Sequence, residues 1–211
     1  MSEGFTETQN TIGFVGSIVG IFAGIASIVN FVDASVLTVG AHITEVAIWF
    51  LWLIIQGVGF LILYRERNEN AALVAFVFAI ISALIEVSIL LMMISQPDIT
   101  DFGAALTSLI QLLIAILVGS FSEAAYLILG GIAILHVTRH GARESLGYAT
   151  SIVFILSGCF ILLGLFGALS FFIPFFLIAA NILACLVFVT PLSSKDLTSE
   201  IAKVEYGLEL E

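Results

Sequence analysis

Long apolar runs without a single Lys or Arg are the feature that most constrains this chain. The run 71–94 is the clearest, since its one ionisable residue is Glu86. A helix needs about 20 apolar residues to span the hydrocarbon core of a bilayer. Backbone N–H and C=O groups in lipid must be bonded within their own segment, which makes helix the expected structure of such runs. The chain is therefore predicted to be an all-α, polytopic integral membrane protein.

Composition supports this fold class. The 211 residues are 61% hydrophobic and only 10% charged, whereas soluble domains are about half apolar and a quarter charged. Little sequence remains between the apolar runs for a separate soluble domain. We expect residues 1–191 to form a single transmembrane domain. In the tail 192–211, apolar residues recur at helical spacing, which predicts a short cytoplasmic amphipathic helix on the membrane or against a neighbour.

Six membrane spans are predicted. They cover approximately residues 11–31, 43–64, 71–94, 115–138, 148–169 and 171–191. The stretch 104–137 is long enough to cross once with an extension, or twice with a tight turn. If it crosses once, we expect 104–115 to be a helix on the outer surface, the beginning of a tilted fourth span, or a re-entrant segment.

The positive charges favour six spans over seven. All six Lys and Arg residues lie in three places, namely Arg65 and Arg67, Arg139 and Arg143, and Lys195 and Lys203. With six spans, these three places share one face of the membrane, and with seven they do not. Because cytoplasmic loops carry an excess of Lys and Arg, we expect both termini in the cytoplasm. The chain is then a multi-pass protein of the cell membrane.

The sequence lacks the patterns that are typical of several classes of function. There is no plausible Ser-His-Asp set, no phosphate-cradling glycine loop, and no His or Cys cluster for a metal or haem. Cys159 and Cys185 have no metal-ligand spacing. The net charge of −10 includes no cluster of Lys and Arg for nucleic acid. We therefore expect no enzyme activity, no cofactor or metal, and no nucleic-acid partner.

Two carboxyl groups within apolar runs, Glu86 and Glu123, are the first functional candidates. A charged side chain at the bilayer centre costs about 2.5–3.5 kcal/mol, so desolvation favours the protonated form. Such a group can carry protons or can tie two helices together by a hydrogen bond. Both residues are candidates for proton coupling, with the structural hydrogen bond as the alternative. Glu45 is expected to be solvated at the outer mouth of the second span.

Amides within the apolar runs have two interpretations. Gln56, Gln111 and Asn181 each act either as a clamp between helices or as a group lining a path. Glycine also has two interpretations, because Gly16 and Gly20 are followed by Gly24 at a spacing of four residues on one helix face. Close approach of backbones there serves either packing within the chain or an interface between subunits.

Two motifs carry a resemblance to a known family. Gln56 stands eight residues before Tyr64, which opens the basic turn "YRERN" with Asn68. Tyr126 begins "YLILGGIAIL", which precedes the second basic turn. With the spacing of the first span, the inner turns and the sixth span, these motifs resemble the acetate uptake transporter family of six-span acetate–succinate permeases. The Asn-Pro-Ala-Pro-Leu-Gly signature of that family is missing, since the chain reads "TQNTIGFVG" there.

The resemblance implies a transporter or channel for a small monocarboxylate such as acetate, in hexameric rings with a narrow path through each protomer. Gln56, Tyr64 and Tyr126 would then line the path, and Asn181 is a further candidate from its amide. The expected partners are the lipid bilayer, the small carboxylate and other copies of the chain. The alternative is a non-catalytic structural subunit within a larger membrane complex, favoured by the glycine face and the scarcity of polar residues on any one helix.

Overall fold

A computed structural model describes residues 7–32, 39–94, 102–139, 144–165 and 172–189. These residues form helices and no strands. In chain order the helices are α1 (Glu7–Val32), α2 (Val39–Arg67), α3 (Asn70–Ile94), α4 (Phe102–Thr138), α5 (Glu144–Gly164) and α6 (Ile173–Val189). The predicted amphipathic tail, 192–211, lies outside the described residues.

Five of the described helices, α1 to α5, are long and apolar enough to cross a membrane, and α6 is a shorter apolar helix of 17 residues. The all-helical, multi-pass class predicted from the sequence is therefore confirmed. Helix bounds differ from prediction at several ends, since α1 begins at Glu7, α2 begins at Val39 and α5 ends at Gly164.

The helix α4 decides among the alternatives for residues 104–115. The predicted fourth span began at residue 115, but the helix runs without interruption from Phe102 to Thr138. The segment 104–115 thus begins the fourth helix, as one of the three alternatives had it, and is neither a separate surface helix nor a re-entrant loop. The stretch contains no proline, which would break the helical hydrogen bonds, and no turn divides it.

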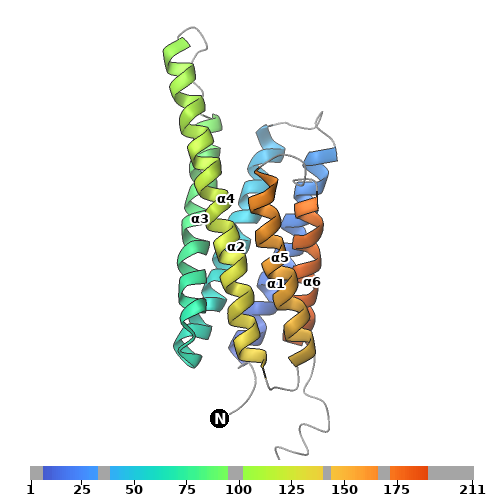
Figure 1. The fold of residues 1–211 in the computed structure, drawn as a ribbon. Helices are drawn as coiled ribbons and strands as arrows, with labels where there is room; N and C mark the ends of the chain where they lie inside the picture. The colour runs from blue at the N-terminus through green and yellow to red at the C-terminus, as the bar shows by residue number, and fades with distance from the viewer. Residues whose placement is uncertain (1–6, 33–38, 95–101, 140–143, 166–171, 190–211) are drawn as a thin grey trace, which may run out of the picture.

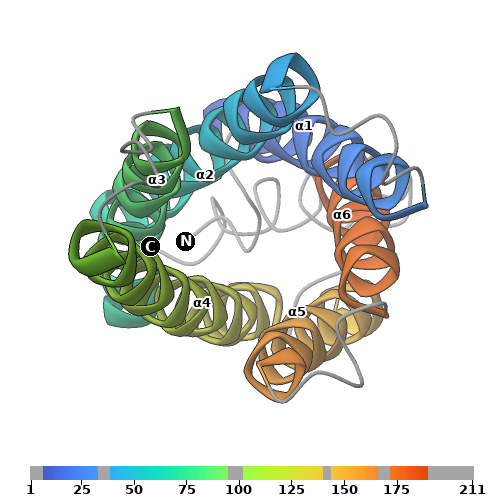
Figure 2. The ribbon, with the colours of Figure 1, turned by 90° about the horizontal axis from the view of Figure 1, so that it is seen from above.

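The six helices form a closed ring. Each helix packs against the next in chain order, and α6 packs against α1 to complete the circle. Figure 2 shows this ring along its axis. The helices alternate in direction, so α1 begins and α6 ends at the same end of the bundle (Figure 1). That end also carries Arg65, Arg67 and Arg139, and we call it the basic end.

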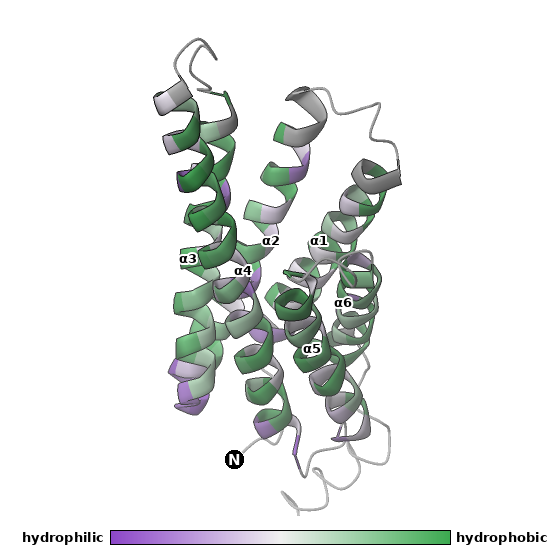
Figure 3. Ribbon diagram, turned by 45° about the horizontal axis from the view of Figure 1, so that its top comes forward, coloured by the Kyte–Doolittle hydropathy of each residue, from purple (hydrophilic) through white to green (hydrophobic). Residues whose placement is uncertain are grey.

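Small residues let the helices of the ring approach closely. Ala72, Ala75, Ala79 and Ala83 recur along one face of α3 and are completely buried. The outer faces, in contrast, expose Leu, Ile, Val and Phe side chains, and Figure 3 shows hydrophobic residues along most of α3 and α4. An apolar exterior around a close-packed interior is the pattern expected of helices in lipid.

The glycine face of α1 serves packing within the chain. A Cβ atom on Gly16 would lie 2.8 Å from Cγ of Gln56, and one on Gly24 would lie 2.5 Å from Cγ1 of Ile178. These distances are shorter than side chains tolerate. The face therefore lies against α2 and α6, which agrees with the first of the two interpretations.

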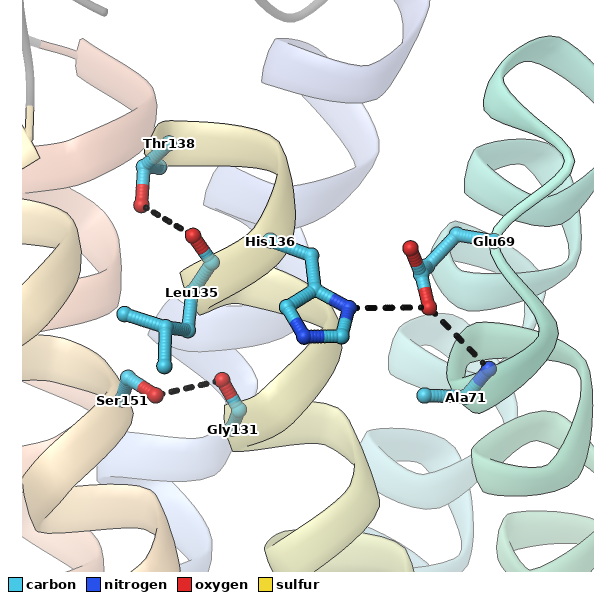
Figure 4. Close-up of polar contacts among 7 residues, drawn as sticks. All are labelled: Glu69, Ala71, Gly131, Leu135, His136, Thr138 and Ser151. Atoms are coloured by element: carbon cyan, nitrogen blue, oxygen red, sulfur yellow. Dashed lines mark hydrogen bonds and ion pairs between the residues drawn. The ribbon is translucent and has the colours of Figure 1, made fainter. Parts of the chain in front are cut away.

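A capped turn joins α2 to α3 at the basic end (Figure 4). Asn68 adopts a left-handed conformation with φ of 54°, and its N–H donates to the Tyr64 carbonyl oxygen at 2.7 Å. Asn tolerates this conformation better than most residues, which suits it to end a helix. Next, Oε1 of Glu69 accepts the Ala71 N–H at 3.3 Å and lies 3.3 Å from Nδ1 of His136 in α4.

Replacing Glu69 by Ala is expected to lower the unfolding free energy by about 1 kcal/mol, because α3 loses its N-terminal cap. The contact with His136 adds little, since the His136 side chain is half exposed and water screens the pair. His136→Ala should therefore change the unfolding free energy much less than Glu69→Ala. An unfolding titration in mixed micelles compares the two variants, and equal losses would show that the pair, rather than the cap, stabilises this turn.

Candidate functional site

Three helices place polar side chains together in the interior of the ring. Gln56 comes from α2, Tyr126 from α4 and Asn181 from α6, and Trp52 lies one turn before Gln56. Gln56 is 7% exposed, and the other three are at most 1% exposed. We call these four residues the polar cluster. The sequence predicted three of them as path residues, and the structure brings those three into one site.

Hydrogen bonds join the polar cluster across the ring. Oδ1 of Asn181 accepts from Nε2 of Gln56 at 2.9 Å and from Nε1 of Trp52 at 3.3 Å. The Tyr126 hydroxyl donates to Oε1 of Gln56. Nδ2 of Asn181 donates to the Leu177 carbonyl oxygen at 2.8 Å. Each amide is thus held by at least two partners, and the cluster links α2, α4 and α6.

The backbone of α1 makes room for this cluster at Gly20. A Cβ atom there would collide with the side-chain amide of Asn181 and would lie 2.5 Å from Nε1 of Trp52. Glycine is therefore required by the close approach of α1 to the hydrogen-bonded side chains.

Aromatic rings continue the cluster along the bundle. The ring centroids of Trp49 and Trp52 are 5.0 Å apart, those of Trp52 and Tyr126 are 5.6 Å apart, and those of Tyr126 and Phe60 are 5.9 Å apart. All three pairs meet edge to face, the geometry that aromatic quadrupoles favour. The rings form a continuous series from Trp49 to Phe60, with the polar cluster in its middle.

A small cavity lies on the Phe60 side of the cluster, toward the basic end. Its volume is about 40 Å³, enough for a few water molecules. Gln56 reaches it from the polar cluster, and most of the remaining wall is apolar. The lining residues are Gln9, Gly13, Gln56, Gly59, Phe60, Leu63, Ile134, Phe154, Ala184 and Phe188.

A second, larger cavity lies on the Trp49 side and is rich in carboxyl groups. It has a volume of about 200 Å³. Its walls come from α1 to α4 and consist of Ser27, Glu45, Val46, Trp49, Glu86, Ile89 and Glu123. We call it the carboxyl cavity. The two proton-coupling candidates, Glu86 and Glu123, thus share one site, although they come from different helices.

Glu45 was predicted to be solvated, but the structure makes it a partly buried wall of the carboxyl cavity. Oε1 of Glu45 accepts from the Ser27 hydroxyl at 2.9 Å, and Oγ of Ser27 accepts from Nε1 of Trp49 at 2.9 Å. A signal for this placement exists in the sequence. Glu45, Trp49, Trp52 and Gln56 recur at spacings of four, three and four, so they form one stripe along α2.

Glu123, a candidate for proton coupling or for a hydrogen bond between helices, has one unsatisfied carboxyl oxygen. Its Oε1 atom is buried and has no hydrogen-bond partner among the described residues. The hydroxyls that precede it in the sequence, Ser120 and Ser122, leave this oxygen unsatisfied. A buried carboxyl oxygen without a donor costs free energy, so this position is less well satisfied than the polar cluster.

Two predicted polar residues lie outside the site. Tyr64, the fourth path candidate, is partly buried near the basic end of α2 and lines neither cavity. Gln111 lies on the exposed first half of α4. Neither residue belongs to the polar cluster.

No protein-family model, curated protein or solved structure matches this chain.

No group of three or more His, Cys, Asp or Glu side chains in the described ranges is placed to hold a metal ion. The site combines neutral hydrogen-bond donors in the interior of a helical ring with carboxyl groups on one side. The function is therefore argued from this geometry.

Proposed function

We propose that this chain is a membrane transporter for a small monocarboxylate such as acetate, coupled to protons through Glu86 and Glu123. The polar cluster is the observation that carries the proposal. It places an indole N–H, a primary amide and a phenol hydroxyl in the interior of an apolar ring, between two cavities.

These donors suit a small carboxylate. Trp52, Gln56 and Tyr126 donate to amide oxygens in this structure. The same N–H and O–H groups can turn to a carboxylate that enters the cluster, because carboxylates accept several hydrogen bonds at once. None of the four cluster residues carries a formal charge. A neutral donor site binds an anion weakly enough to release it, as conduction requires.

The carboxyl cavity supplies the reason for proton coupling. An anion moving past Glu45, Glu86 and Glu123 is repelled if those groups are ionised, because the membrane interior screens charge poorly. Protonation of the glutamates, or of the cargo itself, removes this repulsion. Cargo and proton then pass the cavity together.

We further propose that the chain crosses the membrane six times, with the basic end in the cytoplasm. Arg65, Arg67 and Arg139 lie at that end, in accord with the excess of Arg and Lys on cytoplasmic faces. The 17 residues of α6 span about 25 Å as a helix, close to the hydrocarbon thickness. Both chain termini would then be cytoplasmic. The resemblance to acetate uptake transporters supports the cargo, a homo-oligomer such as a hexamer, and the cell membrane as the location.

Uptake of labelled acetate into proteoliposomes at about pH 7.5 tests this function. The assay is run well above the ordinary carboxyl pKa near 4, since neutral acetic acid leaks through lipid. We expect uptake above that of protein-free vesicles, and we expect Glu86→Gln to reduce it at least about tenfold because the variant cannot exchange a proton.

Glu144→Gln is the matched control for this experiment. Glu144 lies in the first turn of α5, away from both cavities, so uptake should not change. If the Glu86→Gln variant still takes up acetate, the proposed transport function stands and Glu86 has a packing role instead. Absence of uptake for acetate and for other small carboxylates would overturn the proposed function.

A second candidate function is a structural subunit of a larger membrane complex, and α4 favours it. Its 37 residues form a helix about 55 Å long, well beyond a hydrocarbon core of roughly 30 Å. The first half of α4 exposes many large apolar side chains, among them Leu106, Leu109, Ile110, Leu113, Ile114 and Leu117. Other membrane chains packed along this half would cover that surface, and absence of transport would favour this function.

A further inference from the structure

We propose that the small cavity beside the polar cluster is a binding site for a primary amide of the size of acetamide. The inference goes beyond the proposed function, because an amide is neutral and binds without a proton or a charged partner. Its test is a binding measurement that does not depend on acetate uptake.

The first argument is the chemistry of the cavity wall. Its polar side chains are the amides of Gln9 from α1 and Gln56 from α2, both nearly buried, and the other lining residues are glycine or apolar. An anion in such a wall would lose its hydration without meeting an opposite charge, which is costly. A neutral ligand with an amide group and a short apolar chain matches both parts of the wall.

The second argument is the hydrogen-bonding capacity of Gln56. A primary amide has two N–H donors, and its oxygen has two lone pairs. Among the described residues, Nε2 of Gln56 donates once, to Asn181, and Oε1 accepts once, from Tyr126. One donor and one acceptor therefore remain on a side chain that lines the cavity. A carboxylate can use only the donor, whereas a primary amide can pair with both.

The third argument is size. One water molecule needs roughly 10–15 Å³ of such a cavity, so a volume of about 40 Å³ leaves room only for an amide group with a short chain. The ring of Phe188 forms part of the wall, and a Cβ atom on Gly13 would lie 2.5 Å from it. The ring is thus packed directly on the backbone of α1 and cannot move toward α1 to enlarge the cavity.

Trp52 is a built-in reporter for this site, because it donates to the same Asn181 oxygen as Gln56. Titrating the full chain in detergent micelles with acetamide should produce a saturable change in tryptophan fluorescence. Trp49→Phe leaves Trp52 as the only tryptophan, and the change should persist. Acetone is similar in size but has no N–H donor, so its dissociation constant should be at least about tenfold higher.

Substitutions locate the binding. Gln56→Leu removes the amide and should raise the dissociation constant for acetamide at least about tenfold. Because this variant also loses stability, Gly59→Ala supplies a second test. Gly59 lines the cavity, and its added methyl group would meet Cγ2 of Ile12 at 3.5 Å, an ordinary contact, so the fold is kept while space is lost. Gly59→Ala should weaken binding about tenfold, and Gln111→Leu should leave it unchanged.

Three results would overturn the inference. They are no saturable response to acetamide, binding of acetone as tight as that of acetamide, and unchanged acetamide binding in Gly59→Ala. Saturable binding without acetate uptake would retain the amide site and reject the proposed carboxylate transport. Acetate uptake without acetamide binding would do the reverse.

Discussion

Replacing Gln56 by Leu is expected to abolish acetate uptake and to lower the unfolding free energy by about 2 kcal/mol. Gln56 is the residue through which the polar cluster is connected, because it donates to Asn181 and accepts from Tyr126. Leucine has a similar volume but no polar atom. The variant leaves the Tyr126 hydroxyl buried without its acceptor and removes one of the two donors to Oδ1 of Asn181.

The loss of uptake has a separate cause from the loss of stability. In the proposed mechanism Gln56 is a donor to the carboxylate and also reaches the small cavity toward the basic end. Leucine removes the donor and makes the connection between cluster and cavity apolar. Uptake is measured in proteoliposomes, and stability by an unfolding titration in mixed micelles.

Gln111→Leu is the matched control, since it makes the same chemical change on the exposed half of α4. Both uptake and unfolding free energy should remain near those of the unmodified chain. If Gln56→Leu retains uptake, the polar cluster is a clamp between helices and is not the transport path.

Gly20→Ala is expected to lower the unfolding free energy by about 2 kcal/mol, although alanine normally favours a helix over glycine by about 1 kcal/mol. The new Cβ atom would collide with the side-chain amide of Asn181 and press on Nε1 of Trp52. Both groups are fixed by hydrogen bonds and are buried, so neither can move without breaking the cluster.

Gly59→Ala supplies the comparison for this substitution. Its Cβ atom would lie 3.5 Å from Cγ2 of Ile12, an ordinary van der Waals contact. The variant should therefore be as stable as the unmodified chain or up to about 1 kcal/mol more stable, from helix propensity alone. Equal unfolding midpoints for the two alanine variants would show that α1 can shift away from the polar cluster.

Much of the candidate site could be predicted from the sequence. An amide in an apolar run needs a partner, and this reasoning identified Gln56 and Asn181, while the resemblance identified Tyr126. Glu86 and Glu123 followed from the cost of a carboxyl group in lipid. Trp52 was missed, because indoles are common in membrane proteins at the interfaces, and its sequence position does not show that its N–H points inward.

The structure places Tyr64 and Glu45 differently from the sequence analysis. Tyr64 was included from its motif, but it lies about two helical turns beyond Gln56 and lines neither cavity. Glu45 was assigned to solvent from its position near the beginning of a span. Its stripe with Trp49 turns it toward the ring interior, and that direction follows from the packing of α2 between α1 and α3.

By itself, the sequence determined that this chain is helical and that it is apolar enough to cross a membrane several times. The reason is local, since each run must satisfy its own backbone hydrogen bonds and is too apolar for water. Only the tertiary structure decided that α6 closes a ring against α1, and that polar groups from separate helices meet at its centre. Those contacts join residues far apart in the chain, and similar apolar helices can pack in many orders. The choice among those orders comes from close-packed positions such as Gly20 beside Asn181, where the shapes of several helices must fit together.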